Sequence, residues 1–111
     1  MKFIESRVFT KNVGKYFPEE EYTRFQQFLL ENPESGKIII GTGGFRKIRW
    51  VDSRRNKGKR GGIRVIYYHF ISNKEILLFT IYNKNEANDL TFRIKKLMKQ
   101  FIKEDINNEK T

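Results

Sequence analysis

The segment from Glu75 to Tyr82 constrains the fold most, because its residues are apolar at odd and even positions alike. Its centre reads Ile76-Leu77-Leu78-Phe79-Thr80-Ile81. Side chains of a strand alternate between the two faces of a sheet, so a strand that is apolar on both faces has to be buried on both. The sequence therefore predicts a strand that is central in its sheet or covered on both sides.

Two further segments alternate as the two strands of a hairpin do. In the first, Phe45 to Val51, the period of two places Ile48 and Trp50 on one face and Lys47 and Arg49 on the other. The apolar pair is expected to face the core. The two cations are then presented together on the opposite face.

The second hairpin strand is expected from Ile63 to Ile71, after a polar, glycine-containing loop over residues 52–62. One of its faces carries Arg64 together with Ile66, Tyr68 and Phe70. If the hairpin closes, Arg64 lies beside the cations of the first strand.

Helical spacing dominates the first third of the chain. After a short strand over Lys2–Val8, a helix with Thr10 as its cap is expected, with apolar positions Phe9, Val13, Tyr16 and Phe17. A second helix begins near Pro18, where three acids follow, and ends at Asn32-Pro33.

A third helix is expected from about Glu86 to Glu104. Its apolar stripe comprises Leu90, Ile94, Leu97, Met98, Phe101 and Ile102. Residues 106–111 form a polar tail.

The glycines Gly41, Gly43 and Gly44 follow Ile38-Ile39-Ile40, which is expected to be a short buried run. A phosphate-binding nucleotide loop would need a longer spacing, a lysine just after the last glycine and a following helix. Because a strand follows instead, the glycines indicate a tight turn or bulge at the lip of a sheet.

The order of elements is thus strand, two helices, three strands and helix. This order predicts one α+β domain over residues 1–105, with a small, mostly antiparallel sheet packed against helices. A chain of 111 residues can bury about two-thirds of its unfolded surface, which suffices for a core.

The net charge of +10 and the pI near 9.9 indicate a polyanionic partner. Between Arg46 and Arg64 the chain carries nine basic residues and one acid, Asp52. Contacts to backbone phosphates need charge and reach more than fixed geometry. Such contacts are therefore predicted for the cations of the loop, namely Arg54, Arg55, Lys57, Lys59 and Arg60.

Several function classes have no support in the sequence. The chain has no cysteine, and it has no carboxylate pair that suggests a metal-dependent nuclease, so neither metal nor cofactor is expected. No apolar run is long enough for a signal peptide or a membrane span, which predicts a cytoplasmic protein. The one histidine, His69, stands in an apolar strand and is interpreted as structural.

Three segments together resemble a known family. They are Phe45-Arg46-Lys47-Ile48-Arg49, Gly62-Ile63-Arg64-Val65-Ile66-Tyr67-Tyr68 and Phe79-Thr80-Ile81-Tyr82-Asn83-Lys84-Asn85-Glu86. In this order, with Gly-Thr-Gly-Gly before them, they look like the RelE-like bacterial toxins, and in particular the HigB-type branch. The resemblance covers nearly the whole chain and implies the small RelE-like fold, β-α-α-β-β-β-α.

The resemblance implies the toxin of a type II toxin–antitoxin pair, a metal-independent mRNA endonuclease that acts in the ribosomal A site. The ribose 2′-hydroxyl attacks the adjacent phosphorus and leaves a cyclic phosphate. The implied partners are mRNA, ribosomal RNA and a cognate antitoxin, in this branch a helix-turn-helix protein of the HigA type.

Site roles follow from the same resemblance. Lys47 and Arg49 match the basic strand residues used for proton abstraction and phosphate stabilisation, and Arg64 matches the arginine that holds the scissile phosphate. Lys84 matches the basic position that ends the third strand. Arg46 joins the loop cations as a contact to RNA or the ribosome.

The sequence departs from RelE at two positions. Asn85 stands where RelE has a catalytic arginine, and Thr91 stands where it has a helix tyrosine. Tyr82 or Lys84 is therefore expected to supply the general acid. Tyr82 is also the better candidate for a base contact, whereas Tyr67 and Tyr68 fit a sheet core equally well.

Considered without the resemblance, the residues are consistent with RNA cleavage in outline. Cleavage without a metal needs a base, positive charge beside the phosphate oxygens and an acid. A cluster of Lys and Arg can supply all three. The alternative is a non-catalytic binder on the same scaffold, either a ParE-like gyrase inhibitor or an RNA-binding module.

Overall fold

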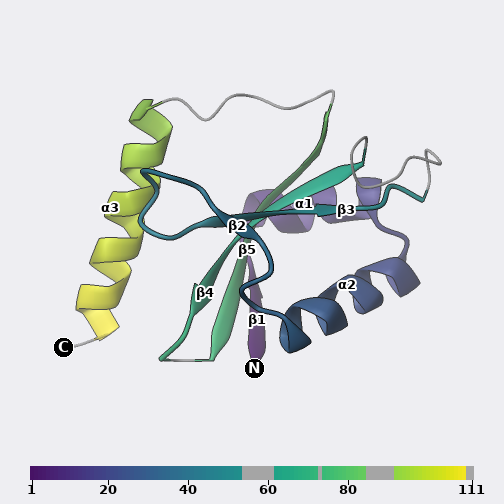
Figure 1. Cartoon of the computed structure of the whole chain (residues 1–111), viewed down its shortest axis with the longest axis horizontal. Helices are drawn as coiled ribbons and strands as arrows, with labels where there is room; N and C mark the ends of the chain where they lie inside the picture. The colour runs from purple at the N-terminus through teal and green to yellow at the C-terminus, as the bar shows by residue number, and fades with distance from the viewer. Residues whose placement is uncertain (54–61, 73, 85–91, 110–111) are drawn as a thin grey trace.

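The computed structural model describes residues 1–53, 62–72, 74–84 and 92–109 (Figure 1). These residues form three helices and one five-stranded sheet. In chain order the elements are β1 (Lys2–Glu5), α1 (Arg7–Tyr16), α2 (Glu19–Glu31), β2 (Lys37–Ile38), β3 (Arg46–Trp50), β4 (Ile63–Phe70), β5 (Glu75–Asn83) and α3 (Phe92–Glu109). The predicted α+β class is confirmed, but the predicted order is not: four described strands rather than three lie between α2 and α3, because Lys37–Ile38 also pairs with β3.

The sheet has the strand order β1-β5-β4-β3-β2. β1 pairs with β5 in parallel, and every other pair is antiparallel. β5 has a strand on each side, which confirms that its doubly apolar sequence belongs inside the sheet.

A bulge interrupts the pairing of β4 with β5. Ile66 is opposite Thr80 whereas Tyr67 is opposite Leu78, so Phe79 is the additional residue on β5. An extra residue reverses which face the following positions occupy. As a result Tyr82 lies on the same face as Leu77 and Phe79, although its number has the opposite parity.

The two faces of the sheet carry separate cores. One core packs α1 and α2, through residues such as Phe9, Phe25 and Leu29, against the side chains of Ile48, Val65, Tyr67 and Leu78. The other packs Met98 and Ile102 of α3 against Phe45, Ile66, Phe70 and Leu77. Figure 1 shows α3 apart from the other two helices, on the opposite side of the strands. The predicted core positions Ile48 and Trp50 are confirmed, since Ile48 is buried and Trp50 packs against the first core.

The start of α1 differs from the expectation. Ser6, not Thr10, is the N-cap, because the Ser6 Oγ accepts a hydrogen bond from the Phe9 amide at 3.0 Å and donates one to the Phe79 carbonyl at 2.6 Å. The Thr10 amide already bonds to the Ser6 carbonyl inside the first turn. The cap thus anchors the helix to β5, and the first strand ends at Glu5 rather than Val8.

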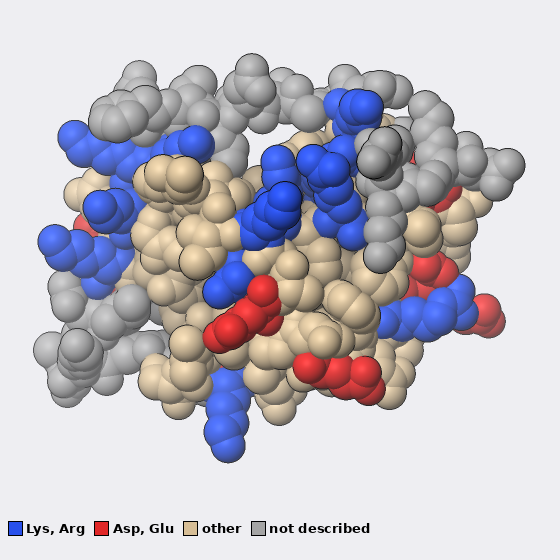
Figure 2. Space-filling view, in the orientation of Figure 1, with Lys and Arg blue, Asp and Glu red and all other residues tan. Residues whose placement is uncertain are grey.

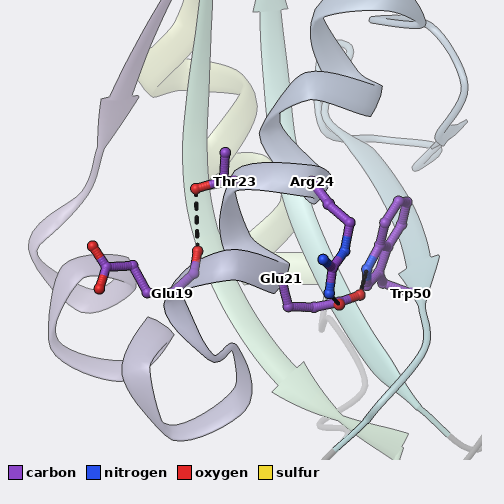
Figure 3. A network of polar contacts seen from close by, with 5 residues as sticks. All are labelled: Glu19, Glu21, Thr23, Arg24 and Trp50. Atoms are coloured by element: carbon purple, nitrogen blue, oxygen red, sulfur yellow. Dashed lines mark hydrogen bonds and ion pairs between the residues drawn. The ribbon is translucent and has the colours of Figure 1, made fainter.

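The second helix agrees with its expected bounds. Pro18 is the N-cap of α2, three acids fill its first turn where the helix dipole favours them, and Asn32 is the C-cap. Glu21 connects this helix to the sheet (Figure 3). Its carboxylate accepts a hydrogen bond from the Trp50 indole Nε1 at 2.9 Å and forms an ion pair with Arg24.

The third helix buries a narrower stripe than predicted. Met98 and Ile102 are 3% and 2% exposed, but Leu97 and Phe101 are 58% and 51% exposed, so their assignment to the core was wrong. In the described structure α3 meets the sheet along one i, i+4 row, and the neighbouring positions face solvent. The expected start at Glu86, the stripe residue Leu90 and the side chain of Ile94 lie outside what the structure describes.

The predicted burial of Ile38-Ile39-Ile40 is also wrong for two of the three residues. Ile38 is 57% and Ile40 is 85% exposed, and only Ile39 packs against a core. The reason is the position of β2, a two-residue strand at the sheet edge that pairs with β3 alone. The following glycines form the expected turn, with positive φ at Gly41, Gly43 and Gly44.

Candidate functional site

Three strands bring Arg49, Arg64 and Tyr82 into one cross-strand row. Arg49 is the partner of Arg64 in the β3–β4 register, and Arg64 is the partner of Tyr82 in the β4–β5 register. Directly opposed residues of antiparallel strands point to the same face, with Cβ atoms about 5 Å apart. Lys47, two residues before Arg49, shares this face, so we refer to Lys47, Arg49, Arg64 and Tyr82 as the cationic row.

Arg64 is the fixed charge of the cationic row. It is only 7% exposed, and its Nη1 donates a hydrogen bond to the Gly62 carbonyl at 2.8 Å. Burial, and secondly the charge of Arg49, lower the pKa of the guanidinium, while Tyr82 acts in the opposite direction. A guanidinium nevertheless remains charged in a protein. The row therefore holds a permanent cation that is partly removed from water, where its interaction with an anion is stronger.

Tyr82 adds a neutral hydroxyl beside that charge. Burial raises the pKa of the phenol, and the neighbouring Arg64 lowers it by a smaller amount. The side chain also packs against the core that includes α3. At neutral pH the phenol is therefore protonated, which makes it a proton donor rather than a base.

Lys47 and Arg49 reach the outer edge of the sheet. Both line a groove of about 480 Å³ that also involves Lys37, Phe28 and Trp50. Lys47 is half-buried and Arg49 is exposed. The groove is thus lined by both cationic and aromatic side chains.

Lys37 was missed by the sequence reasoning. It is the partner of Lys47 in the β2–β3 register, so it belongs to the same end of the sheet. β2 has only two residues, which is too short for an alternating pattern to reveal it. The only available signal was a cation directly before an apolar triplet.

Lys84 follows the last residue of β5. Its amide donates to the Gly62 carbonyl at 3.3 Å, the same oxygen that accepts the Arg64 Nη1 hydrogen bond. Gly62 therefore connects the end of β5 to the buried arginine. The Lys84 side chain is exposed.

Arg46 lies on the other face of β3. Its Nη1 donates to the carbonyls of Glu34 and Gly36 at 3.0 and 2.8 Å, so its guanidinium supports the segment before β2. The structure does not bring it together with the cationic row. Its contact with RNA stays a prediction.

Other predicted residues lie outside the described residues. They are the loop cations Arg54, Arg55, Lys57, Lys59 and Arg60 and the two departures Asn85 and Thr91. Tyr67 is fully buried and belongs to the core that includes α1 and α2, whereas Tyr68 packs against the core that includes α3. His69 is half-buried, and within the described structure its Nδ1 has no hydrogen-bond partner.

No cluster of three or more His, Cys, Asp or Glu residues that could hold a metal ion occurs in the described part of the chain. Among its helices, none is both long and apolar enough to cross a membrane. No protein-family model matches the sequence.

Proposed function

We propose that the protein is the toxin of a type II toxin–antitoxin pair and a ribosome-dependent, metal-independent mRNA endonuclease with a RelE-like fold of the HigB type. The observation that carries the proposal is the cationic row, in which Arg49, Arg64 and Tyr82 lie side by side on three strands. The proposed partners are mRNA in the ribosomal A site, ribosomal RNA and a helix-turn-helix antitoxin, all met in the cytoplasm.

In the proposed reaction the ribose 2′-oxygen attacks the adjacent phosphorus and the bond from phosphorus to the 5′-oxygen breaks. The products are a 2′,3′-cyclic phosphate and a free 5′-hydroxyl. Lys47 is the candidate base that takes the proton of the 2′-hydroxyl. Arg49 and Arg64 stabilise the negative charge that develops on the phosphate oxygens.

The leaving 5′-oxygen needs a proton, and we assign this role first to Tyr82. Its hydroxyl is protonated at neutral pH and lies in the row next to the arginine that holds the phosphate. Lys84 is the second candidate, since its exposed ammonium follows β5 directly. Comparing Tyr82→Phe with Lys84→Met under single-turnover conditions on ribosomes separates the two, because only loss of the acid slows the chemical step.

The decisive test of the proposal is Arg64→Ala. Loss of one preorganised charge at a transition state costs about 10²- to 10³-fold in rate, so growth inhibition and codon-phased mRNA cuts should disappear. The variant should retain its fold and its binding to the antitoxin. Arg64 is buried, so a second variant at an exposed position is needed. This variant is Arg49→Ala, which should also reduce growth inhibition and mRNA cleavage.

The matched control is Arg7→Ala, which removes an exposed arginine from α1. It should leave growth inhibition unchanged. A folded Arg64→Ala variant that remains fully toxic contradicts the site. DNA damage with intact mRNA after induction favours the gyrase inhibitor instead.

A further inference from the structure

A second groove, separate from the cationic row, lies between α3 and the turn that follows β2. It has a volume of about 770 Å³ and is lined by Ile40, Gly41 and four lysines, Lys95, Lys96, Lys99 and Lys103, with Gln100 among them. Within the part of the chain that the structure describes, no carboxylate lines it. We call the four lysines the α3 lysine patch.

The α3 lysine patch is a regular array. Lys95, Lys99 and Lys103 are four residues apart, which places them on one side of the helix about 6 Å from one another along its axis. Like charges at this spacing destabilise a helix by about 0.2–0.5 kcal/mol per pair. Helix stability therefore does not explain the array.

The turn that contains Gly41 and Gly43 lies against the aliphatic stems of Lys95 and Lys99. A Cβ on Gly43 would lie 3.1 Å from the Lys99 Cγ and 3.3 Å from its Cα, and one on Gly41 would lie 3.6 Å from the Lys95 Cδ. Both glycines have a positive φ, which L side chains rarely adopt. The turn can lie against α3 because it is made of glycine. The aliphatic stems of Lys95 and Lys99 pack beneath it while their ammonium groups can still reach water.

Basic side chains gather around the groove, and acidic side chains lie in the lower middle and at the right of the same face (Figure 2). Figure 2 shows Lys and Arg side chains gathered over α3 at the left and over the middle of this face. Lys96, Lys99 and Lys103 are exposed. In the described structure the groove therefore presents several free ammonium groups to a partner at once.

We propose that the α3 lysine patch binds the phosphate backbone of RNA and docks the protein on it independently of the cationic row. Lysines on flexible stems act as point charges, which suits repeated phosphates more than a fixed bidentate partner. Among the described residues, none of those that line the groove is aromatic, whereas aromatic anchors are typical of a protein interface. The choice of RNA over other nucleic acids rests on the proposed function.

The test removes three charges from the patch. Lys95→Gln, Lys99→Gln and Lys103→Gln are combined, since glutamine keeps the helix propensity of lysine and most of its length. The matched control combines Lys2→Gln, Lys11→Gln and Lys15→Gln, which are exposed residues of β1 and α1. Both triple variants lose the same net charge, so long-range attraction falls equally in both.

The probe is a fluorescent RNA hairpin, and an unpaired RNA of equal length shows whether paired structure matters. Fluorescence anisotropy gives the affinity as a function of NaCl concentration. For the patch variant we expect the slope of log affinity against log salt to become less steep by about 2 to 3. Each lost phosphate contact reduces the magnitude of this slope by about 0.7 to 0.9, and three contacts are removed. The control slope should stay near that of the wild type. Circular dichroism checks folding, and Lys103→Gln alone should show about a third of the effect.

Three results would overturn the inference. They are a wild type that binds neither RNA, equal losses in the two triple variants, and a patch variant that binds RNA normally but loses binding to a polyglutamate peptide. The last result identifies an acidic protein segment as the partner. The protein could bind the hairpin through the patch and yet leave mRNA intact in cells. That result would support the inference about the patch and contradict the proposed endonuclease activity.

Discussion

Tyr67 illustrates how one buried hydroxyl fixes a segment of irregular backbone. Its oxygen accepts a hydrogen bond from the Gly36 amide and donates one to the Pro33 carbonyl, both at 2.9 Å. A Cβ on Gly36 would come within 2.8 Å of the Tyr67 ring, so only glycine fits there. This contact sets where the chain enters β2, and hence where Lys37 meets the cationic row.

Tyr67→Phe should therefore destabilise the protein. It leaves the buried Gly36 amide without its partner, and an unsatisfied buried donor costs about 1–3 kcal/mol. Urea denaturation of the variant measures the loss. Tyr68→Phe is the control, because in the described structure the Tyr68 hydroxyl makes no hydrogen bond and burial alone raises its pKa. Equal losses in the two variants would show that the Tyr67 bonds are not stabilising.

Single residues also show what a sequence can and cannot reveal. Ile48 and Trp50 were correctly placed because strand alternation is a local rule. Leu97 and Phe101 were misplaced because the width of a buried helix stripe depends on how closely a distant surface approaches. Lys37 was missed because its strand exists only through pairing with β3.

At the scale of elements, Glu21 joins α2 to β3. Hydrogen bonds from Arg24 and then from Trp50 lower the pKa of its carboxyl below the ordinary value of 4.5, while burial opposes them. A carboxylate with a depressed folded-state pKa stabilises the protein above its unfolded pKa, and this contribution is lost as the pH falls through the folded pKa. The contact between helix and sheet should thus weaken in acid.

Glu21→Gln should cost about 1 kcal/mol at neutral pH, and the difference from the wild type should shrink below about pH 4.5. Urea denaturation at a series of pH values gives both quantities. Trp50 is the only tryptophan, so its fluorescence reports on this contact directly. A difference that stays constant down to about pH 3 would contradict the assignment of the lowered pKa to Glu21.

The elements were easier to predict from sequence than their relations. Helix α2 carries its own signals, with a proline and acids at the start and Asn32-Pro33 at the end. The bulge at Phe79 has no comparable signal, because it is a property of two paired strands. It nevertheless decides that Tyr82 faces Arg64, so the candidate site depends on a feature that the sequence did not indicate.

The whole molecule carries a net charge of +10, and its own field opposes compaction. Salt screens such repulsion over a Debye length of about 10 Å at 0.1 M. Moderate NaCl should therefore stabilise the folded protein. A gain of about 1 kcal/mol in the free energy of unfolding would raise the melting temperature of a small domain by about 4–8 °C. The triple lysine variant has a net charge of +7, from +10 minus three, and should respond less. A melting temperature that falls with salt would show that attractive ion pairs dominate instead.

The parallel pairing of β1 with β5 has a consequence for synthesis. Lys2 to Glu5 pair with Glu75 to Leu78, so the first strand has no partner until more than seventy further residues have left the ribosome. The bond that ties the Ser6 cap of α1 to the sheet waits for the same strand, because the Ser6 hydroxyl donates to the Phe79 carbonyl. Contacts this distant in sequence form slowly, since the intervening chain must first be ordered. A nascent chain of this protein would therefore complete its sheet, and with it the cationic row, only after β5 has left the ribosome.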